Sequence, residues 1–84
     1  EYILKDFSIL PNPFHSTFSI RLGEIAKKDG FVEVYDLSGQ LIKKMSYYSG
    51  DQNVEMDLSD ASSGTYLVRV SINGEVKQQR VVKQ

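Results

Sequence analysis

The amino-acid sequence predicts an all-β, immunoglobulin-like antiparallel β-sandwich of about seven strands without a disulfide. Apolar and polar residues alternate in most segments, as in strands that bury one face. Turn-forming residues interrupt these segments at the short, regular spacing that is typical of a sandwich. The chain contains no cysteine and no tryptophan. The Cys–Trp–Cys signature of true immunoglobulin domains is therefore absent, and the prediction concerns the architecture alone.

Six turns rich in Gly, Pro, Asn, Asp and Ser divide the chain into seven predicted strands. The strands are expected at about 3–10, 16–23, 31–36, 40–48, 53–59, 65–72 and 75–83. Asn73-Gly74 gives the sharpest turn prediction, because both residues tolerate positive φ and suit a two-residue type I′ hairpin. It predicts that the last two strands are antiparallel neighbours.

The alternation also predicts which side chains are buried. A shift of one residue would turn a whole strand inside out, so the apolar face must be the inner one. The predicted core contains Phe18, Ile20, Leu22, Val34, Leu58, Tyr66, Val68 and Val70. Tyr47 and Tyr48 are adjacent on one strand, so one ring is expected inside and the other outside. Residues 23–28 have some helical character but are too few for a stable helix.

Length and composition restrict the chain to one small domain, so residues 1–84 are expected to form a single unit. The hydrophobic content of 40% and the charged content of 25% are typical of a folded domain. The net charge of −1 argues against a nucleic-acid partner. No apolar run approaches the roughly 20 residues of a membrane span, so direct membrane insertion is not expected. The chain begins with Glu1 rather than Met, and we expect it to be a fragment of a longer secreted protein.

The sequence offers no constellation for catalysis. Nucleophilic catalysis requires a nucleophile, a base and an orienting group within reach of one another. His15 is the single histidine, and its position after a proline-rich turn predicts an exposed loop residue. One histidine without cysteine cannot build a zinc site. We therefore expect no enzymatic activity.

Several aspartates lie beside turn glycines, which raises the question of calcium. Asp29, Asp36 and Asp51 occupy such positions, and Asp57 and Asp60 precede the turn at Ser62-Ser63-Gly64. Aspartate at a turn commonly accepts hydrogen bonds from the local backbone, and that role explains all five. We expect neither a metal nor another cofactor.

Three groups of residues follow a recognisable order. The first is Pro11-Asn12-Pro13-Phe14, and the second is residues 32–41, which contain Asp36 and Gly39. The third is residues 64–70, with Gly64 and Tyr66, followed by a short hairpin and a closing segment at 77–83. This order and spacing resembles the type A C-terminal sorting domain of the type IX secretion system. The resemblance covers essentially the whole chain.

The resemblance implies a signal that directs a secreted cargo protein across the outer membrane. Its implied partners are the type IX translocon, the shuttle proteins and an N-terminal cargo domain. A sortase-like cysteine protease then removes the domain by a cut N-terminal to the sandwich. The implied location is secreted, with the periplasm in transit to the outer-membrane surface or the extracellular space. The motif residues it indicates are Pro11, Asn12, Pro13, Asp36, Gly39, Gly64, Tyr66, Lys77, Val82 and Lys83.

Physical roles can be assigned to the same residues. Pro11 and Pro13 lack backbone donors and should end the pairing of the first strand. The last strand is expected to lie at a sheet edge and to end freely at Gln84. Its basic residues, Lys77 and Lys83 among them, would protect this edge from promiscuous pairing and select an acidic partner, or would only keep the edge soluble.

A second functional class remains open at this point. A β-sandwich can serve as a carbohydrate-binding or adhesion module of an extracellular enzyme, with sugar rings stacked on exposed aromatic side chains. Tyr47 and Tyr48 offer the only such candidates, because one of the two rings must face outward. A purely structural spacer would require no site at all.

Overall fold

The computed structural model describes residues 7–72 and 74–84, and every regular element in this part of the chain is a β-strand. The strands are β1 (Phe7–Leu10), β2 (Thr17–Leu22), β3 (Gly30–Asp36), β4 (Leu41–Tyr47), β5 (Asn53–Asp57), β6 (Gly64–Ile72) and β7 (Glu75–Lys83). These bounds agree closely with the prediction, except that residues 3–6 of the first predicted strand lie outside the described residues. β1 ends at Leu10, directly before Pro11, as expected.

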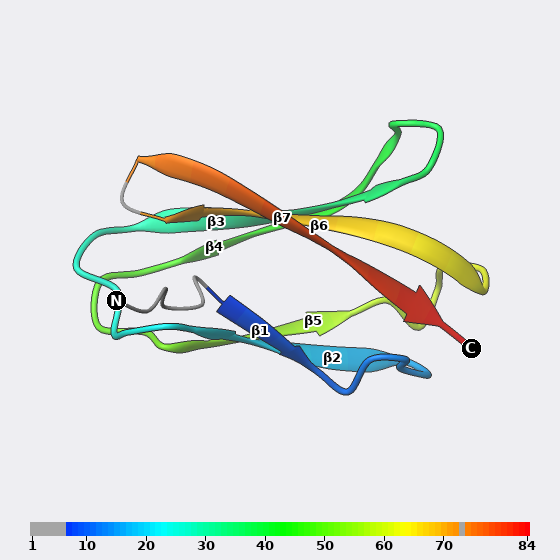
Figure 1. The fold of residues 1–84 in the computed structure, drawn as a ribbon, viewed down its shortest axis with the longest axis horizontal. Helices are drawn as coiled ribbons and strands as arrows, with labels where there is room; N and C mark the ends of the chain where they lie inside the picture. Colours follow the sequence, from blue (N-terminus) through cyan, green and yellow to red (C-terminus); the bar gives the residue numbers. More distant parts are fainter. Residues whose placement is uncertain (1–6, 73) are drawn as a thin grey trace, which may run out of the picture.

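The strands form two antiparallel sheets stacked face to face, as Figure 1 shows. One sheet has the order β1-β2-β5 and the other the order β4-β3-β6-β7. The predicted β-sandwich is confirmed. β7 lies at an edge of the four-stranded sheet, which was also expected.

The core lies between the sheets, and its members follow the predicted alternation. All eight residues predicted to be inside are buried. The core also contains Phe7, Ile9, Phe14, Val32, Tyr47, Val54, Met56 and Val81. Phe14 packs edge-on against Phe18, with 4.8 Å between the ring centroids. Each apolar side chain buried in this way stabilises the fold by about 1.5–3 kcal/mol.

Two hairpins determine the shape of the ends of the sandwich. β6 and β7 pair from Ile72–Glu75 to Gly64–Lys83, and Gly74 has a φ of 86°, so the predicted hairpin is confirmed. Asn73 lies outside the described residues, and the type I′ assignment stays a prediction. β3 and β4 form the second hairpin, whose turn projects beyond the sandwich in Figure 1. Its register shifts between Val34 and Tyr35, which pair with Lys43 and Leu41. This bulge had no signal in the sequence.

Candidate functional site

Most of the motif residues gather at one end of the sandwich, although they are far apart in the sequence. The β1–β2 loop, the β3–β4 turn, the β5–β6 loop and the end of β7 all lie at this end (Figure 1). Alternating strand directions explain this, because every second connection of an antiparallel sandwich returns to the same end. Lys77 is the exception, since it pairs with Val70 near the opposite end of β7.

Asp36 and Gly39 shape the turn of the β3–β4 hairpin. Asp36 Oδ1 accepts hydrogen bonds from Ser38 N at 2.9 Å, Ser38 Oγ at 2.6 Å and Gln40 N at 3.0 Å. These donors, the Ser38 hydroxyl first, lower the pKa of Asp36. Gly39 has a φ of 92°, a conformation that a residue with a Cβ adopts only with strain. The predicted turn role of Asp36 is confirmed.

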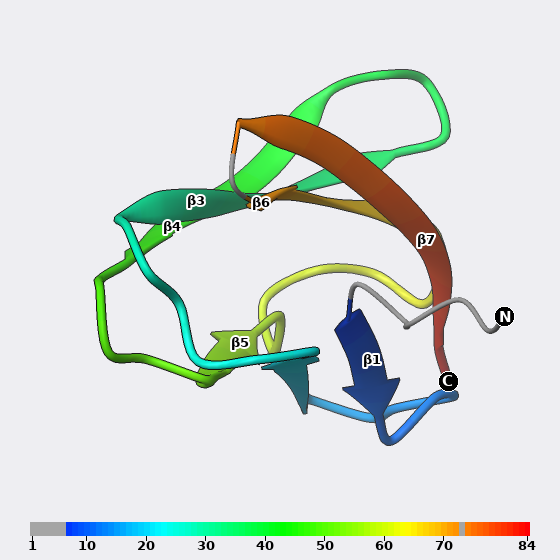
Figure 2. The same ribbon diagram turned by 60° about the vertical axis from the view of Figure 1, so that its left-hand side comes forward.

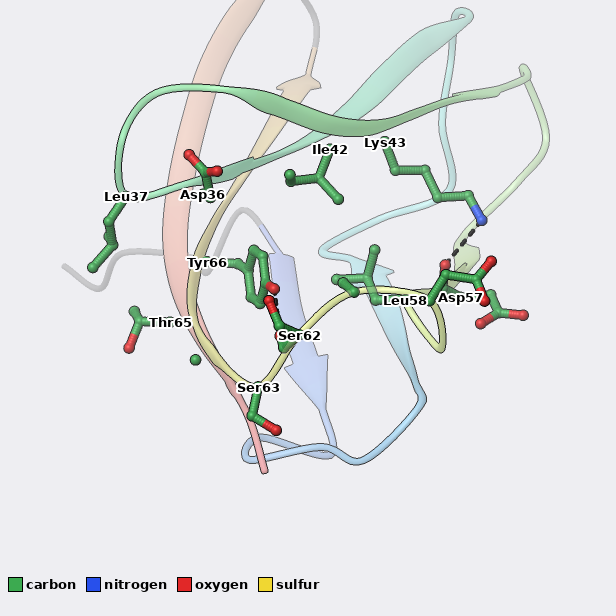
Figure 3. Close-up of a pocket in the computed structure, with 13 residues that line it drawn as sticks. Asp36, Leu37, Ile42, Lys43, Asp57, Leu58, Ser62, Ser63, Thr65 and Tyr66 are labelled. Carbon is green, nitrogen blue, oxygen red and sulfur yellow. Dashed lines mark hydrogen bonds between the residues drawn. The ribbon is translucent and has the colours of Figure 1, made fainter.

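The β5–β6 loop carries Gly64 and leads to Tyr66. Asp57 Oδ1 accepts a hydrogen bond from Ser59 N at 2.8 Å, and this interaction is the main cause of the lowered pKa of Asp57. The Tyr66 ring is buried, and its hydroxyl donates a hydrogen bond to the backbone oxygen of Ser62 (Figure 3). Tyr66 therefore connects the core to the loop that precedes its own strand.

Lys83 holds the same loop from the end of β7. Its Nζ donates to the backbone oxygens of Leu58 at 2.8 Å, Ser59 at 3.3 Å and Ala61 at 2.5 Å. An ammonium group has three N–H donors, and these three acceptors match them. The charged group of Lys83 thus binds backbone oxygens of the domain itself. The sequence alone had predicted a solvent-facing lysine at a strand edge.

The end of β7 is fastened to the β1–β2 loop, as Figure 2 indicates. Phe14 N donates to Val82 O, and Gln84 N donates to Phe14 O, both at 2.9 Å. The Asn12 side chain accepts from Val82 N at 3.0 Å and donates to Arg80 O at 3.4 Å. We call these five residues the clasp: Asn12, Phe14, Arg80, Val82 and Gln84. The expectation that the strand ends freely at Gln84 is wrong, because Phe14 forms an isolated parallel bridge with Lys83 and its backbone oxygen accepts a hydrogen bond from Gln84 N.

A pocket of about 750 Å³ lies between the β3–β4 hairpin and the β5–β6 loop (Figure 3). The hairpin contributes Asp36, Leu37, Ile42 and Lys43. The β5–β6 loop and the strand ends beside it contribute Asp57, Leu58 and residues 60–66. Lys43 Nζ crosses the pocket and donates to the backbone oxygen of Asp57 at 2.9 Å. Neither the pocket nor the contact of Lys43 across it has a local signal in the sequence, because the hairpin and the loop do not indicate by themselves what lies opposite.

The exposure of the other predicted residues follows from their positions in loops and strands. Pro11, Pro13 and His15 are exposed in the β1–β2 loop, as predicted for His15. Val82 is 39% exposed, so its side chain stays available although its backbone belongs to the clasp. Tyr47 is buried and Tyr48 is exposed, as predicted for this pair. Within residues 7–72 and 74–84, no three His, Cys, Asp or Glu side chains gather to hold a metal ion.

None of the described residues form a helix that is long and apolar enough to span a membrane.

The comparison with known families gives a direct match. The model of the family described as the secretion system C-terminal sorting domain matches residues 8–84. The chain belongs to this family. No curated protein matches the chain.

The sorting domain is thus the C-terminal sorting signal of a protein secreted by the type IX system. Such a signal implies a cargo N-terminal to it and passage of the whole protein through the outer membrane. The match favours this function over the carbohydrate-binding alternative. Sorting domains of this kind are signals and are not known as catalysts.

Proposed function

We propose that the export machinery binds the sorting domain at the outer edge of β7. The binding partners in this proposal are the shuttle proteins and the translocon of the type IX system, which act while the protein crosses the periplasm. The observation that carries the proposal is the position of β7, an edge strand whose outer edge bonds to other described residues at one end. Unpaired backbone groups on an edge strand are a template for a partner's strand.

The clasp reveals which backbone groups of β7 face outward. Arg80 O, Val82 N, Val82 O and Gln84 N all bond across the outer edge. Both backbone groups of alternate residues point to the same side of an antiparallel strand. Val76 and Gln78 therefore present their N–H and C=O groups at the part of the edge that the clasp does not reach. Strand addition at residues 76–78 requires no rearrangement of the strands in residues 7–72 and 74–84.

Charge at this edge favours an acidic partner. Lys77 and Arg80 are its basic side chains, and Glu75 Oε1 lies 3.1 Å from Lys77 Nζ. Lys83 acts differently in the proposal: it keeps the β5–β6 loop and the end of β7 in place instead of contacting the partner. Val76 and Val82, both exposed, supply apolar contact on the outer face.

The later step is removal of the domain by a sortase-like cysteine protease. A cut N-terminal to Phe7 would leave every described strand paired, because β1 begins at this residue. In this proposal residues 1–84 act as one domain that travels with its cargo and is released as a folded unit.

The test uses the full chain fused behind a reporter cargo in cells with an active type IX system. Gln78→Pro removes one outward N–H and leaves the ladder to β6 intact, since proline is tolerated on edge strands with the N–H side toward solvent. Gln78→Ala keeps the N–H and is the matched control. We expect Gln78→Pro to leave the reporter inside the outer membrane and Gln78→Ala to export it normally, while both variants keep cooperative unfolding.

Truncation after Arg80 would not test the signal separately from the fold. It deletes Val81, which is fully buried, together with part of the clasp and Lys83. Loss of export would then report unfolding rather than loss of the signal. Normal export of a folded Gln78→Pro fusion would refute recognition by strand addition at this edge.

A further inference from the structure

The β3–β4 hairpin exposes more apolar surface than a turn requires. Leu37, Leu41 and Ile42 are among the large hydrophobic side chains that face solvent in the described residues, with Leu37 66% exposed. Leu37 and Ile42 line the pocket, opposite the buried Leu58 and the half-buried Ala61. Exposed apolar side chains gathered beside a cavity are typical of a binding site.

The charges around this apolar surface are predominantly negative. Asp36, Asp57 and Asp60 line the pocket, whereas Lys43 is the single basic side chain among its lining residues. Lys43 is engaged with the Asp57 backbone oxygen, so its charge lies toward one wall. Hydrogen bonds from the backbone and from serine lower the pKa values of Asp36 and Asp57, and both carboxylates are ionised at neutral pH. The pocket is therefore lined by both apolar and polar groups, and acidic side chains outnumber basic ones among its charged residues.

We propose that this pocket is a second docking site, which binds an extended segment of a partner protein in which an apolar side chain is flanked by basic ones. The apolar side chain would lie against Leu37, Ile42 and Leu58, and the basic groups would meet the carboxylates that line the pocket. The volume of about 750 Å³ is suited to a short stretch of peptide. This site is distinct from the edge of β7, and its charge preference is the opposite one.

The walls of the pocket are fixed before any partner arrives. Three hydrogen bonds from Lys83 Nζ hold the loop carbonyls of Leu58, Ser59 and Ala61. The three hydrogen bonds to Asp36 Oδ1 fix the hairpin turn on the other side. A preformed pocket loses little conformational freedom on binding, which favours affinity for a short segment. The motif residues Asp36 and Lys83 therefore act here as positioning residues.

The probe is a short synthetic peptide in which Leu alternates with Lys, compared with a peptide in which Leu alternates with Glu. Methyl resonances of the intact chain report the site: Leu37, Ile42 and Ala61 for the pocket, and Val76 and Val82 for the edge of β7. We expect the Leu/Lys peptide to shift the pocket methyl resonances, with affinity that falls as salt is added. The Leu/Glu peptide should bind at least about tenfold more weakly.

Two pairs of variants separate this site from unspecific binding. Leu37→Ser should weaken binding of the Leu/Lys peptide about fivefold or more, and Ile25→Ser, at an exposed residue of the β2–β3 loop, should not. Asp60→Lys should weaken it by a similar factor, and Glu24→Lys, with the same change in net charge, should not. Equal effects within either pair, or equal binding of the two peptides, would overturn the proposal. Shifts confined to Val76 and Val82 would also overturn it, while leaving recognition at the edge of β7 intact.

Discussion

The ring of Tyr47 occupies the space that a side chain at Gly30 would need. A Cβ at position 30 would lie far inside van der Waals contact with the Tyr47 ring and 2.8 Å from the backbone oxygen of Ser71. The Tyr47 hydroxyl donates to that same oxygen, so the ring cannot turn away without losing its partner. We expect Gly30→Ala to lower the free energy of unfolding by about 1–3 kcal/mol through overpacking. Urea unfolding of this variant measures the loss, and Gly50→Ala, where a Cβ has open space but φ is 100°, separates overpacking from backbone strain.

Lys83→Met should destabilise the domain although it removes a charged residue from an edge strand. The substitution leaves three backbone oxygens of the β5–β6 loop without their donor. We expect a loss of about 1–3 kcal/mol, which lowers Tm by several degrees in a domain of this size. Lys27→Met, at an exposed lysine of the β2–β3 loop, is the control. Equal Tm values for the two variants would contradict the role assigned to Lys83.

Acid should destabilise the domain through Asp36 and Asp57. Both carboxyl groups have a folded-state pKa below the ordinary value of 3.8, so each adds stability that is complete well above that value. This contribution is lost as the pH falls through the lowered folded pKa, so the decline begins at about pH 4–5 and continues below it. Asp36→Asn keeps an oxygen acceptor for the turn and should show a shallower decline than the original chain. A parallel decline in urea-unfolding measurements would show that Asp36 is not involved.

Substitutions of Phe14 and Asn12, the two clasp residues of the β1–β2 loop, should lower the stability of the domain by unequal amounts. Phe14→Ala empties a fully buried site and should cost about 3–5 kcal/mol of stability. Asn12→Ala removes two hydrogen bonds at an exposed position and should cost about 1 kcal/mol. Hydrogen exchange of the Val82 amide should accelerate in Asn12→Ala while that of the Val68 amide is nearly unchanged. Equal acceleration at both amides would indicate global rather than local opening.

Metal removal should leave the domain unaffected. Asp29 accepts a hydrogen bond from Ser49 N and Asp51 accepts one from Tyr48 N, so both carboxylates take part in the structure of the turns. We expect the same Tm with and without a chelator, and no hydrolytic activity of the isolated chain. A fall in Tm of several degrees on chelation would show that metal binding contributes to the folding free energy.

Local patterns in the sequence were sufficient for the strands and for half of the core residues. Apolar and polar residues alternate around Phe18 and Ile20 and around Val68 and Val70, and this alternation indicates which face of each strand is buried. The turn signal Asn73-Gly74 likewise predicted that the last two strands are antiparallel neighbours. Phe14 was missed because it follows two prolines in a segment with the composition of a loop. The contact between Asn12 and Val82 joins residues that are 70 positions apart in the sequence, so no local periodicity indicates it.

The same separation has a consequence for folding on the ribosome. Chain closure between residues 12 and 82 must wait until nearly the entire domain has been synthesised, and its entropy cost is among the largest in the fold. A translation product that stopped before Val81 would lack a core residue and most of the clasp. Such a product would lack the fastened edge at which we propose that the export machinery binds. Under that proposal, secretion would require a chain synthesised at least through Val82, so that assembly of the clasp reports how far translation has proceeded.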